Sequence, residues 1–151
     1  MQPDPDSPAP MPSTYIPAAL RRFITERARH CCEYCLIDQQ DTPATHEVDH
    51  LVAVKHGGQP QSENLALACL RCNRLKGSDL TAIDPLDGSV MPLFNPRLHA
   101  WKDHFEIAGV LIRGLTPAGR ATVALLRLND RDRLRVREDS MAVGRFPPSW
   151  I

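Results

Sequence analysis

Two Cys-x-x-Cys pairs constrain the fold of this 151-residue sequence more than any other feature. The first pair is Cys32 and Cys35, and the second is Cys69 and Cys72, with 33 residues between the pairs. Each pair can direct two sulfurs at one point, so a chain that folds back can surround a structural zinc ion with four thiolates. We therefore predict one structural Zn²⁺ bound by these four cysteines. The alternative, a redox dithiol, needs one pair that opens a helix rather than two pairs.

The fifth cysteine is not expected to bind the metal, and the two cysteine pairs indicate the cellular compartment. Cys31 has a poorer spacing to Cys35 than Cys32 has, so we expect a spare thiol rather than a ligand. Paired Cys-x-x-Cys units are typical of metal ligands where thiols stay reduced, which indicates the cytoplasm. The sequence shows no signal peptide and no run of about 18 apolar residues, so we expect no membrane association.

Length and charge set modest bounds on the fold and on its partners. A chain of 151 residues fits one small domain with tails. Aromatic residues make up only 5% of the sequence, so a bound metal would add stability that a small core lacks. The formal net charge is zero, but seven arginines and only two aspartates lie between residues 113 and 137. This segment predicts either a basic face that contacts phosphates or a solvated helix surface.

Composition and periodicity divide the chain into three parts. Residues 1–14 contain five prolines and no apolar run, which is typical of a disordered or docked tail. Residues 15–77 should form a compact unit that holds both cysteine pairs. Residues 78–151 should form an extension of an irregular arm, a strand and helices packed on that unit. The expected fold class is α+β.

The compact unit is predicted to begin with a helix and to continue as strand, loop, strand and helix. Apolar residues recur at a spacing of three and four near the start of the unit. They are Leu20, Phe23, Ile24 and Ala28. Residues 47–52 alternate as a strand with one wet face, with Glu47 and Asp49 on the same side. A turn at Gly57 and Gly58 should lead to a second strand or a helical turn, and a helix after Cys72 should end at Gly77.

The extension shows turn signals first and helical signals later. Asp-Pro, Asp-Gly and Asn-Pro pairs in residues 78–98 indicate an irregular arm. Residues 109–112 are predicted as a strand. Thr116 has the character of a helix N-cap with Pro117 at the first helical position, opening an amphipathic helix to residue 129. An Arg-rich helix should follow it.

Further residues are regularly placed between and around the cysteine pairs. They are the runs Glu47-Val48-Asp49-His50, Gly57-Gly58, Glu63-Asn64-Leu65 and Cys69-x-x-Cys72-Asn73-x-x-Lys76-Gly77. In this order, the sequence from about residue 29 to 77 resembles the HNH endonuclease family, whose core is a ββα-metal finger clamped by zinc. The stretch from Pro92 to Leu128 is similar to the extension of a bacterial subgroup of such proteins.

The resemblance implies an enzyme that hydrolyses DNA phosphodiester bonds and leaves a 5′ phosphate and a 3′ hydroxyl. It makes His50 the general base, Asp49 and Asn73 the ligands of one catalytic metal ion, and Asn64 the residue that orients His50 or its loop. Asn73 stands where the family name has a histidine, and an amide oxygen beside a carboxylate favours Mg²⁺ or Mn²⁺ over a second zinc. Lys76 is expected either to contact a phosphate or to favour the C-terminal end of its helix.

The residue types suit this chemistry. Hydrolysis needs a water that loses a proton in line with the leaving 3′ oxygen, and imidazoles titrate near neutrality. A divalent ion neutralises the charge that develops on the phosphate. Two other functions remain open, namely a noncatalytic zinc finger that binds nucleic acid and a zinc-stapled protein-interaction module. Because no recognition helix is legible in the sequence, a partner protein could supply specificity for the DNA.

Overall fold

The computed structural model describes residues 5–6 and 15–151, which form a mixed α/β fold with three two-stranded antiparallel sheets. This confirms the expected fold class. The predicted tail lies outside the described residues except for residues 5–6. No helix in the described ranges is long and apolar enough to cross a lipid bilayer.

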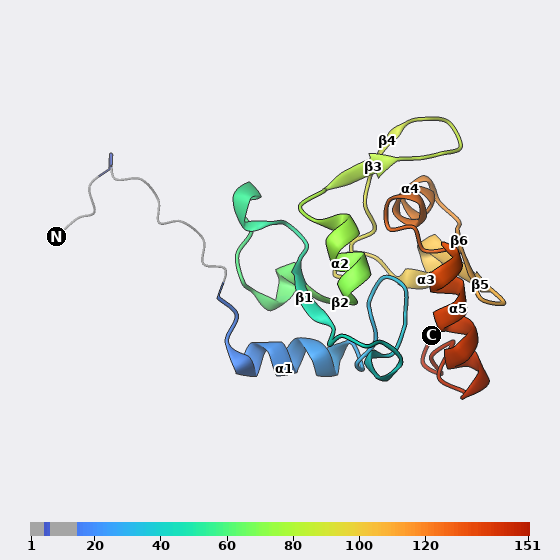
Figure 1. Cartoon of the computed structure of the whole chain (residues 1–151). Helices are drawn as coiled ribbons and strands as arrows, with labels where there is room; N and C mark the ends of the chain where they lie inside the picture. The colour runs from blue at the N-terminus through green and yellow to red at the C-terminus, as the bar shows by residue number, and fades with distance from the viewer. Residues whose placement is uncertain (1–4, 7–14) are drawn as a thin grey trace.

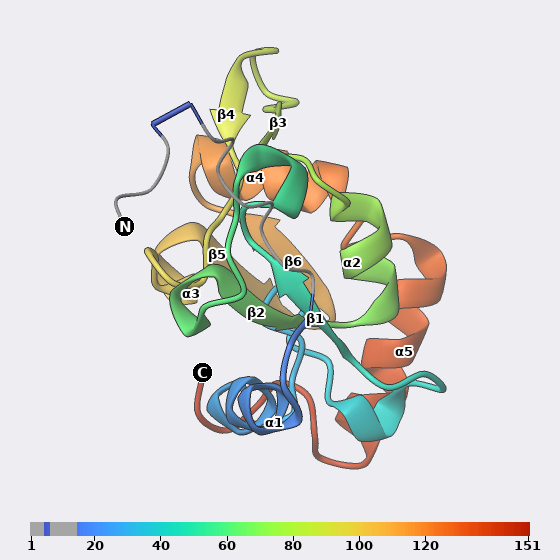
Figure 2. The ribbon, with the colours of Figure 1, turned by 90° about the vertical axis from the view of Figure 1, so that its left-hand side faces the viewer.

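Residues 32–77 form a small unit that we term the finger. Its strands β1 (Glu47–His50) and β2 (Leu65–Ala68) pair antiparallel, and α2 (Leu70–Lys76) follows β2 at once. Figures 1 and 2 show α2 between this hairpin and the later helices. The predicted order of strand, loop, strand and helix is therefore confirmed. Short 3-10 helices in its loops are η1 (Gln39–Asp41), η2 (Val54–His56) and η3 (Ser62–Asn64).

The strand β1 alternates as expected, but its polar side is covered as well as its apolar side. Glu47 and Asp49 face α2, and Asp49 exposes only 4% of its surface. Val48, on the opposite side, packs against the buried cluster that includes Ile24 of the first helix. The prediction of a solvent-exposed face on β1 was wrong because α2 covers that face. The carboxylates of Glu47 and Asp49 therefore contact polar side chains of α2.

The helix α1 (Ala18–Arg27) precedes the finger and packs on β2. Ile24 is fully buried against Leu65 and Leu67, as the periodicity predicts. Phe23 is 51% exposed and therefore does not belong to the buried face, to which the sequence had assigned it. Arg27 donates hydrogen bonds to the carbonyls of Ser62 and Leu65, at 3.0 and 2.6 Å, which ties α1 to the edge of the finger.

The extension is more regular than the turn signals suggested. The expected irregular arm contains a hairpin whose turn runs from Asp84 to Gly88, and Gly109, with φ of 64°, separates two strands rather than belonging to one. The elements are β3 (Thr81–Ile83), β4 (Val90–Pro92), α3 (Trp101–His104), β5 (Phe105–Ala108), β6 (Leu111–Gly114), α4 (Pro117–Leu125) and α5 (Arg131–Ala142).

The helix boundaries follow from local hydrogen bonds. Thr116 accepts a hydrogen bond from Gly119 N and Pro117 is the first residue of α4, as predicted. The helix ends at Leu125 rather than at residue 129, and Arg127 beyond it has a φ of 48°. The helix α2 begins before Cys72 rather than after it, because the Cys69 sulfur caps its first turn.

One hydrophobic core joins the finger to the extension. It runs from Tyr34 and Leu51 of the finger to Phe94, Trp101 and Phe105 of the extension. The Trp101 indole N–H donates to the Tyr34 carbonyl at 2.9 Å, which satisfies the polar atom of a buried aromatic. The predicted boundary at residue 77 thus lies between two parts that share their apolar interior.

The Arg-rich segment does not form a single basic face. Arg133 and Arg137 are buried, with exposed fractions of 7% and 2%. Arg120 forms a salt bridge with the buried Asp84 at 2.8 Å, and the more exposed Arg113 lies 3.7 Å from Glu106. The sequence could not reveal this because both buried arginines lie on the inner side of α5.

The loop that joins β1 to β2 is closed by a glycine with no space for a side chain. A Cβ atom on Gly58 would lie 1.7 Å from the Val52 carbonyl oxygen and 2.9 Å from the Asn64 side-chain nitrogen. Gly57, next to it, has a φ of 90° but open space around its Cα. The two glycines therefore serve different purposes, since one permits a close approach and the other a left-handed turn.

We predict that Gly58→Ala destabilises the protein by about 3 kcal/mol or more, because the backbone of the loop must move. Gly57→Ala should cost only about 1 kcal/mol, the usual penalty of a left-handed alanine. Urea unfolding of both variants measures the difference. Equal losses would contradict the close approach at Gly58.

Candidate functional site

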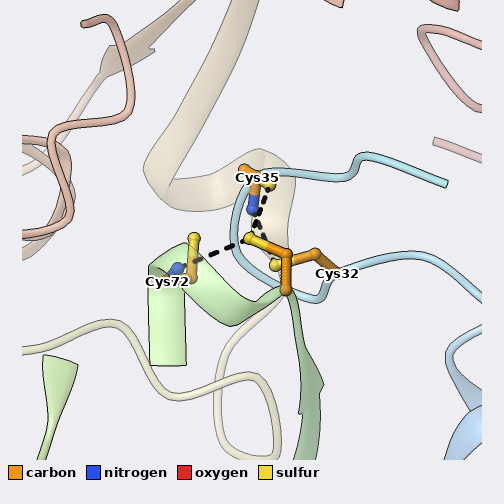
Figure 3. A group of neighbouring side chains, drawn as sticks. Cys32, Cys35 and Cys72 are labelled. Carbon is orange, nitrogen blue, oxygen red and sulfur yellow. Dashed lines mark hydrogen bonds between the residues drawn. The ribbon is translucent and has the colours of Figure 1, made fainter. Parts of the chain in front are cut away.

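The four predicted ligand cysteines lie together in the finger. The sulfurs of Cys32, Cys35, Cys69 and Cys72 are all within 4.8 Å of one another, and all four residues are buried. Figure 3 shows Cys32 and Cys35 on the loop after α1 and Cys72 on the first turn of α2. We term this group the sulfur cage.

Both Cys-x-x-Cys turns are shaped by backbone hydrogen bonds to sulfur. Cys35 N donates to the Cys32 sulfur at 3.5 Å, and Cys72 N donates to the Cys69 sulfur at 3.4 Å. Leu36, with φ of 66°, turns the chain sharply after the first pair. The two turns therefore present their sulfurs to one point, since both lie at the open end of the β1–β2 hairpin, where Glu47 pairs with Ala68.

The dimensions of the cage fit a tetrahedral metal ion. The Cys35 and Cys69 sulfurs are 3.8 Å apart. A tetrahedron with zinc–sulfur bonds of about 2.3 Å has edges of about 3.8 Å. All five cysteines are free thiols, so no disulfide competes with this arrangement.

Burial opposes free thiolates at most positions of the cage. Burial raises the pKa of the Cys32 and Cys72 thiols well above their ordinary value. Hydrogen bonds from the three other cysteines hold the pKa of Cys35 well below it. Four thiolates in such a space need a divalent ion to share their charge.

Cys31 lies outside the sulfur cage. Burial raises the pKa of its thiol to about 12, and the nearby Asp38 adds to the effect. The Cys31 backbone forms a β-bridge with Asp38. An unreactive buried thiol with a local packing role accounts for these features.

Asp49 is held in place by two partners. The Tyr34 hydroxyl donates to its Oδ2 atom at 2.8 Å, and Lys76 Nζ lies 3.1 Å from the same oxygen. Burial raises the pKa of Asp49, although Lys76 and the Tyr34 hydroxyl act in the opposite direction. Lys76 is itself only 3% exposed and lies in the last turn of α2.

Asn73 and Lys76 lie one turn apart on α2 and both contact β1. The Asn73 side-chain amide donates to the Glu47 carboxylate, while Lys76 Nζ donates to the His50 carbonyl at 3.1 Å. Glu47 and Asp49 occupy the same face of β1 because they are two positions apart. Two carboxylates, an amide and an ammonium group thus meet between β1 and α2.

Glu47 is the residue of this group that sequence reasoning missed as a site residue. The signal was present, because the alternation of β1 places it beside Asp49. The direct partner of Asn73 is Glu47, and no hydrogen bond links Asn73 to Asp49 within the described ranges. The two residues predicted as a ligand pair therefore share one interface, but no hydrogen bond joins them among the described residues.

His50 ends β1 and is half-buried. Its Nε2 atom is shielded and has no hydrogen-bond partner among the described residues. Buried polar atoms are normally paired, so an unpaired imidazole nitrogen calls for an explanation. His46 places its Nε2 atom 3.0 Å from the Ile37 carbonyl, while its Nδ1 atom is also buried without a partner among the described residues.

Asn64 braces the loop that follows His50. Its side-chain oxygen accepts from Val52 N at 2.8 Å, and its nitrogen donates to the carbonyls of Val52 and Gln59 at 3.0 Å each. Asn64 N in turn donates to the Gln61 carbonyl. The amide therefore holds the loop rather than the His50 ring.

Comparison with known proteins agrees with the motif order. Residues 32–79 match the family model of the HNH endonuclease. The Septu protein PtuB of Bacillus thuringiensis is 28% identical over 119 residues, which cover 76% of this chain and 43% of that protein. The chain thus spans less than half the length of this relative. No solved structure matches the chain. Residues 32–79 of this chain therefore match an HNH endonuclease domain.

Proposed function

We propose that this chain is a metal-dependent endonuclease that hydrolyses phosphodiester bonds in DNA and leaves a 5′ phosphate and a 3′ hydroxyl. The observation that carries the proposal is the unpaired Nε2 atom of His50, which stands one residue after Asp49 in an HNH-family domain. A general base needs an imidazole nitrogen that no protein group occupies, and His50 Nε2 meets this requirement directly after Asp49.

His50 is the general base in this proposal. Its backbone is fixed by β1 and by the hydrogen bond from Lys76 to its carbonyl, and Asn64 fixes the loop beyond it. This role requires the ring to turn so that Nε2 meets a water molecule, since Nε2 is shielded in the structure. His50 then takes the proton of that water as the water attacks phosphorus.

The group between β1 and α2 fits a catalytic Mg²⁺ or Mn²⁺. Oxygen donors are what these ions require, and Asp49, Asn73 and the neighbouring Glu47 offer carboxylate and amide oxygens. Because the Asn73 nitrogen is engaged by Glu47, its oxygen is the atom left for an ion. When bound, the ion would neutralise charge on the scissile phosphate.

Lys76 moderates the charge of this group. Its ammonium forms an ion pair with Asp49, so one positive group offsets part of the negative charge that Glu47 and Asp49 bring to this group. A reduced negative charge lowers repulsion of the DNA phosphate. The same ion pair orients the Asp49 carboxylate through its Oδ2 atom.

The sulfur cage is proposed to hold one structural Zn²⁺ that fixes the start of α2 against the first cysteine turn. Asn73 follows Cys72 directly, so the cage would position Asn73 and Lys76 over β1. DNA is the proposed substrate, and a partner protein is proposed to supply specificity.

We predict that the purified chain nicks supercoiled plasmid in the presence of Mg²⁺ or Mn²⁺ and that His50→Ala lowers the rate by about 10²–10⁴-fold, because general-base assistance is lost. Zinc content should stay unchanged. His56→Ala is the matched control, because His56 is exposed on the η2 turn of the same loop.

Two results would refute the nuclease proposal. One is binding of DNA on a gel without cleavage under any divalent ion, which would indicate a noncatalytic zinc finger. The other is cleavage that persists at the wild-type rate in His50→Ala.

Asn64→Ala should lower stability by about 1–3 kcal/mol, since it leaves backbone groups of the loop unpaired. The nicking rate should fall with it, whereas zinc content should not. Gln61→Ala serves as the control because Gln61 is exposed in the same loop and its side chain makes no cap bond. Thermal unfolding and plasmid nicking measure both effects, and a rate equal to that of Gln61→Ala would argue against a positioning role for Asn64.

A further inference from the structure

Arg133 of α5 reaches the sulfur cage from the extension. One guanidinium nitrogen donates to the Cys72 sulfur at 2.9 Å, and another donates to the Leu126 carbonyl at 3.1 Å. The side chain is buried, and 61 residues separate it from Cys72 in the sequence. A residue of the extension is therefore a direct neighbour of a candidate metal ligand.

The buried charge of Arg133 lacks a carboxylate partner. Among the described residues, no salt bridge joins Arg133 or Arg137 to an acidic side chain. Arg137, one turn further along α5, donates to the carbonyls of Val110 and Leu128. A buried cation without a counter-charge is strongly unfavourable, so the compensating negative charge must come from another source.

The sulfur cage can supply that charge. Four thiolates around one divalent ion carry a net charge of −2, and two guanidinium groups would cancel it. Cys72 receives the N–H group directly, which stabilises its sulfur as a thiolate.

A second contact joins the start of α5 to α2. Arg71 of α2 bonds to the carboxylates of Asp130 and Asp132, at the start of α5. These side chains are partly exposed, so their ion pairs contribute little on their own. The buried contact of Arg133 is therefore the stronger candidate for the docking of α5.

We propose that Arg133 is an outer-sphere partner of the metal centre, which retains the ion in the sulfur cage and docks α5 on the finger only when the cage is loaded. The inference rests on the structural zinc of the proposed function and not on the hydrolytic activity. It assigns to the extension a role in metal retention that the finger does not fulfil alone.

The test uses the full chain loaded with zinc and compares Arg133→Met with Arg135→Met. Arg135 is exposed on the same helix, so its substitution controls for loss of charge and for helix propensity. Zinc release to a chromogenic chelator should be about tenfold faster, or more, in Arg133→Met, since removal of outer-shell partners typically costs 10–100-fold in metal affinity. Arg133→Lys should be intermediate because it keeps the charge but loses the planar fork.

Release from Arg133→Met at the rate of the Arg135→Met control would overturn the proposal. If Arg133→Met does not fold, hydrogen exchange on the wild-type chain before and after zinc removal decides the question. Residues 131–142 should lose protection when zinc is removed, and unchanged protection there would also overturn the proposal. A wild-type chain that binds no zinc would instead refute the structural metal itself, which plasmid nicking does not measure.

Discussion

The convergence of four cysteine sulfurs on one point is the constraint on which the rest of the structure depends. The sulfurs of Cys32 and Cys35 come from the loop after α1, and those of Cys69 and Cys72 come from the start of α2. Their contact closes the β1–β2 hairpin into a loop and lays α2 across the hairpin. The side chains of Asn73 and Lys76 reach β1 only because α2 starts at the cage.

Buried charged residues lie on both sides of the sulfur cage, in the finger and in α5. On one side, Asp49 and Lys76 compensate each other within the finger at 3.1 Å. On the other side, Arg133 donates a hydrogen bond to the Cys72 sulfur at 2.9 Å. No salt bridge joins Arg133 to a carboxylate in the described part of the chain. Buried ion pairs add little net stability but cost much when one member is lost. The geometry of the finger is therefore sensitive to changes in residues that contact no substrate.

Local signals in the sequence predicted the elements that local rules determine. The cysteine pairs, the turn at Gly57 and the Thr116 cap all appear as expected. Predictions failed where a distant segment decides the outcome. The covered face of β1 and the inward arginines of α5 depend on packing between parts that are far apart in the sequence, and Glu47 gained a partner only through α2.

X-ray absorption at the zinc edge of the purified chain tests the central claim most directly, because it reports the atoms bound to the ion. The account predicts one zinc per chain with four sulfur neighbours at about 2.3 Å. Nitrogen or oxygen neighbours in place of sulfur, or a chain without zinc, would contradict it.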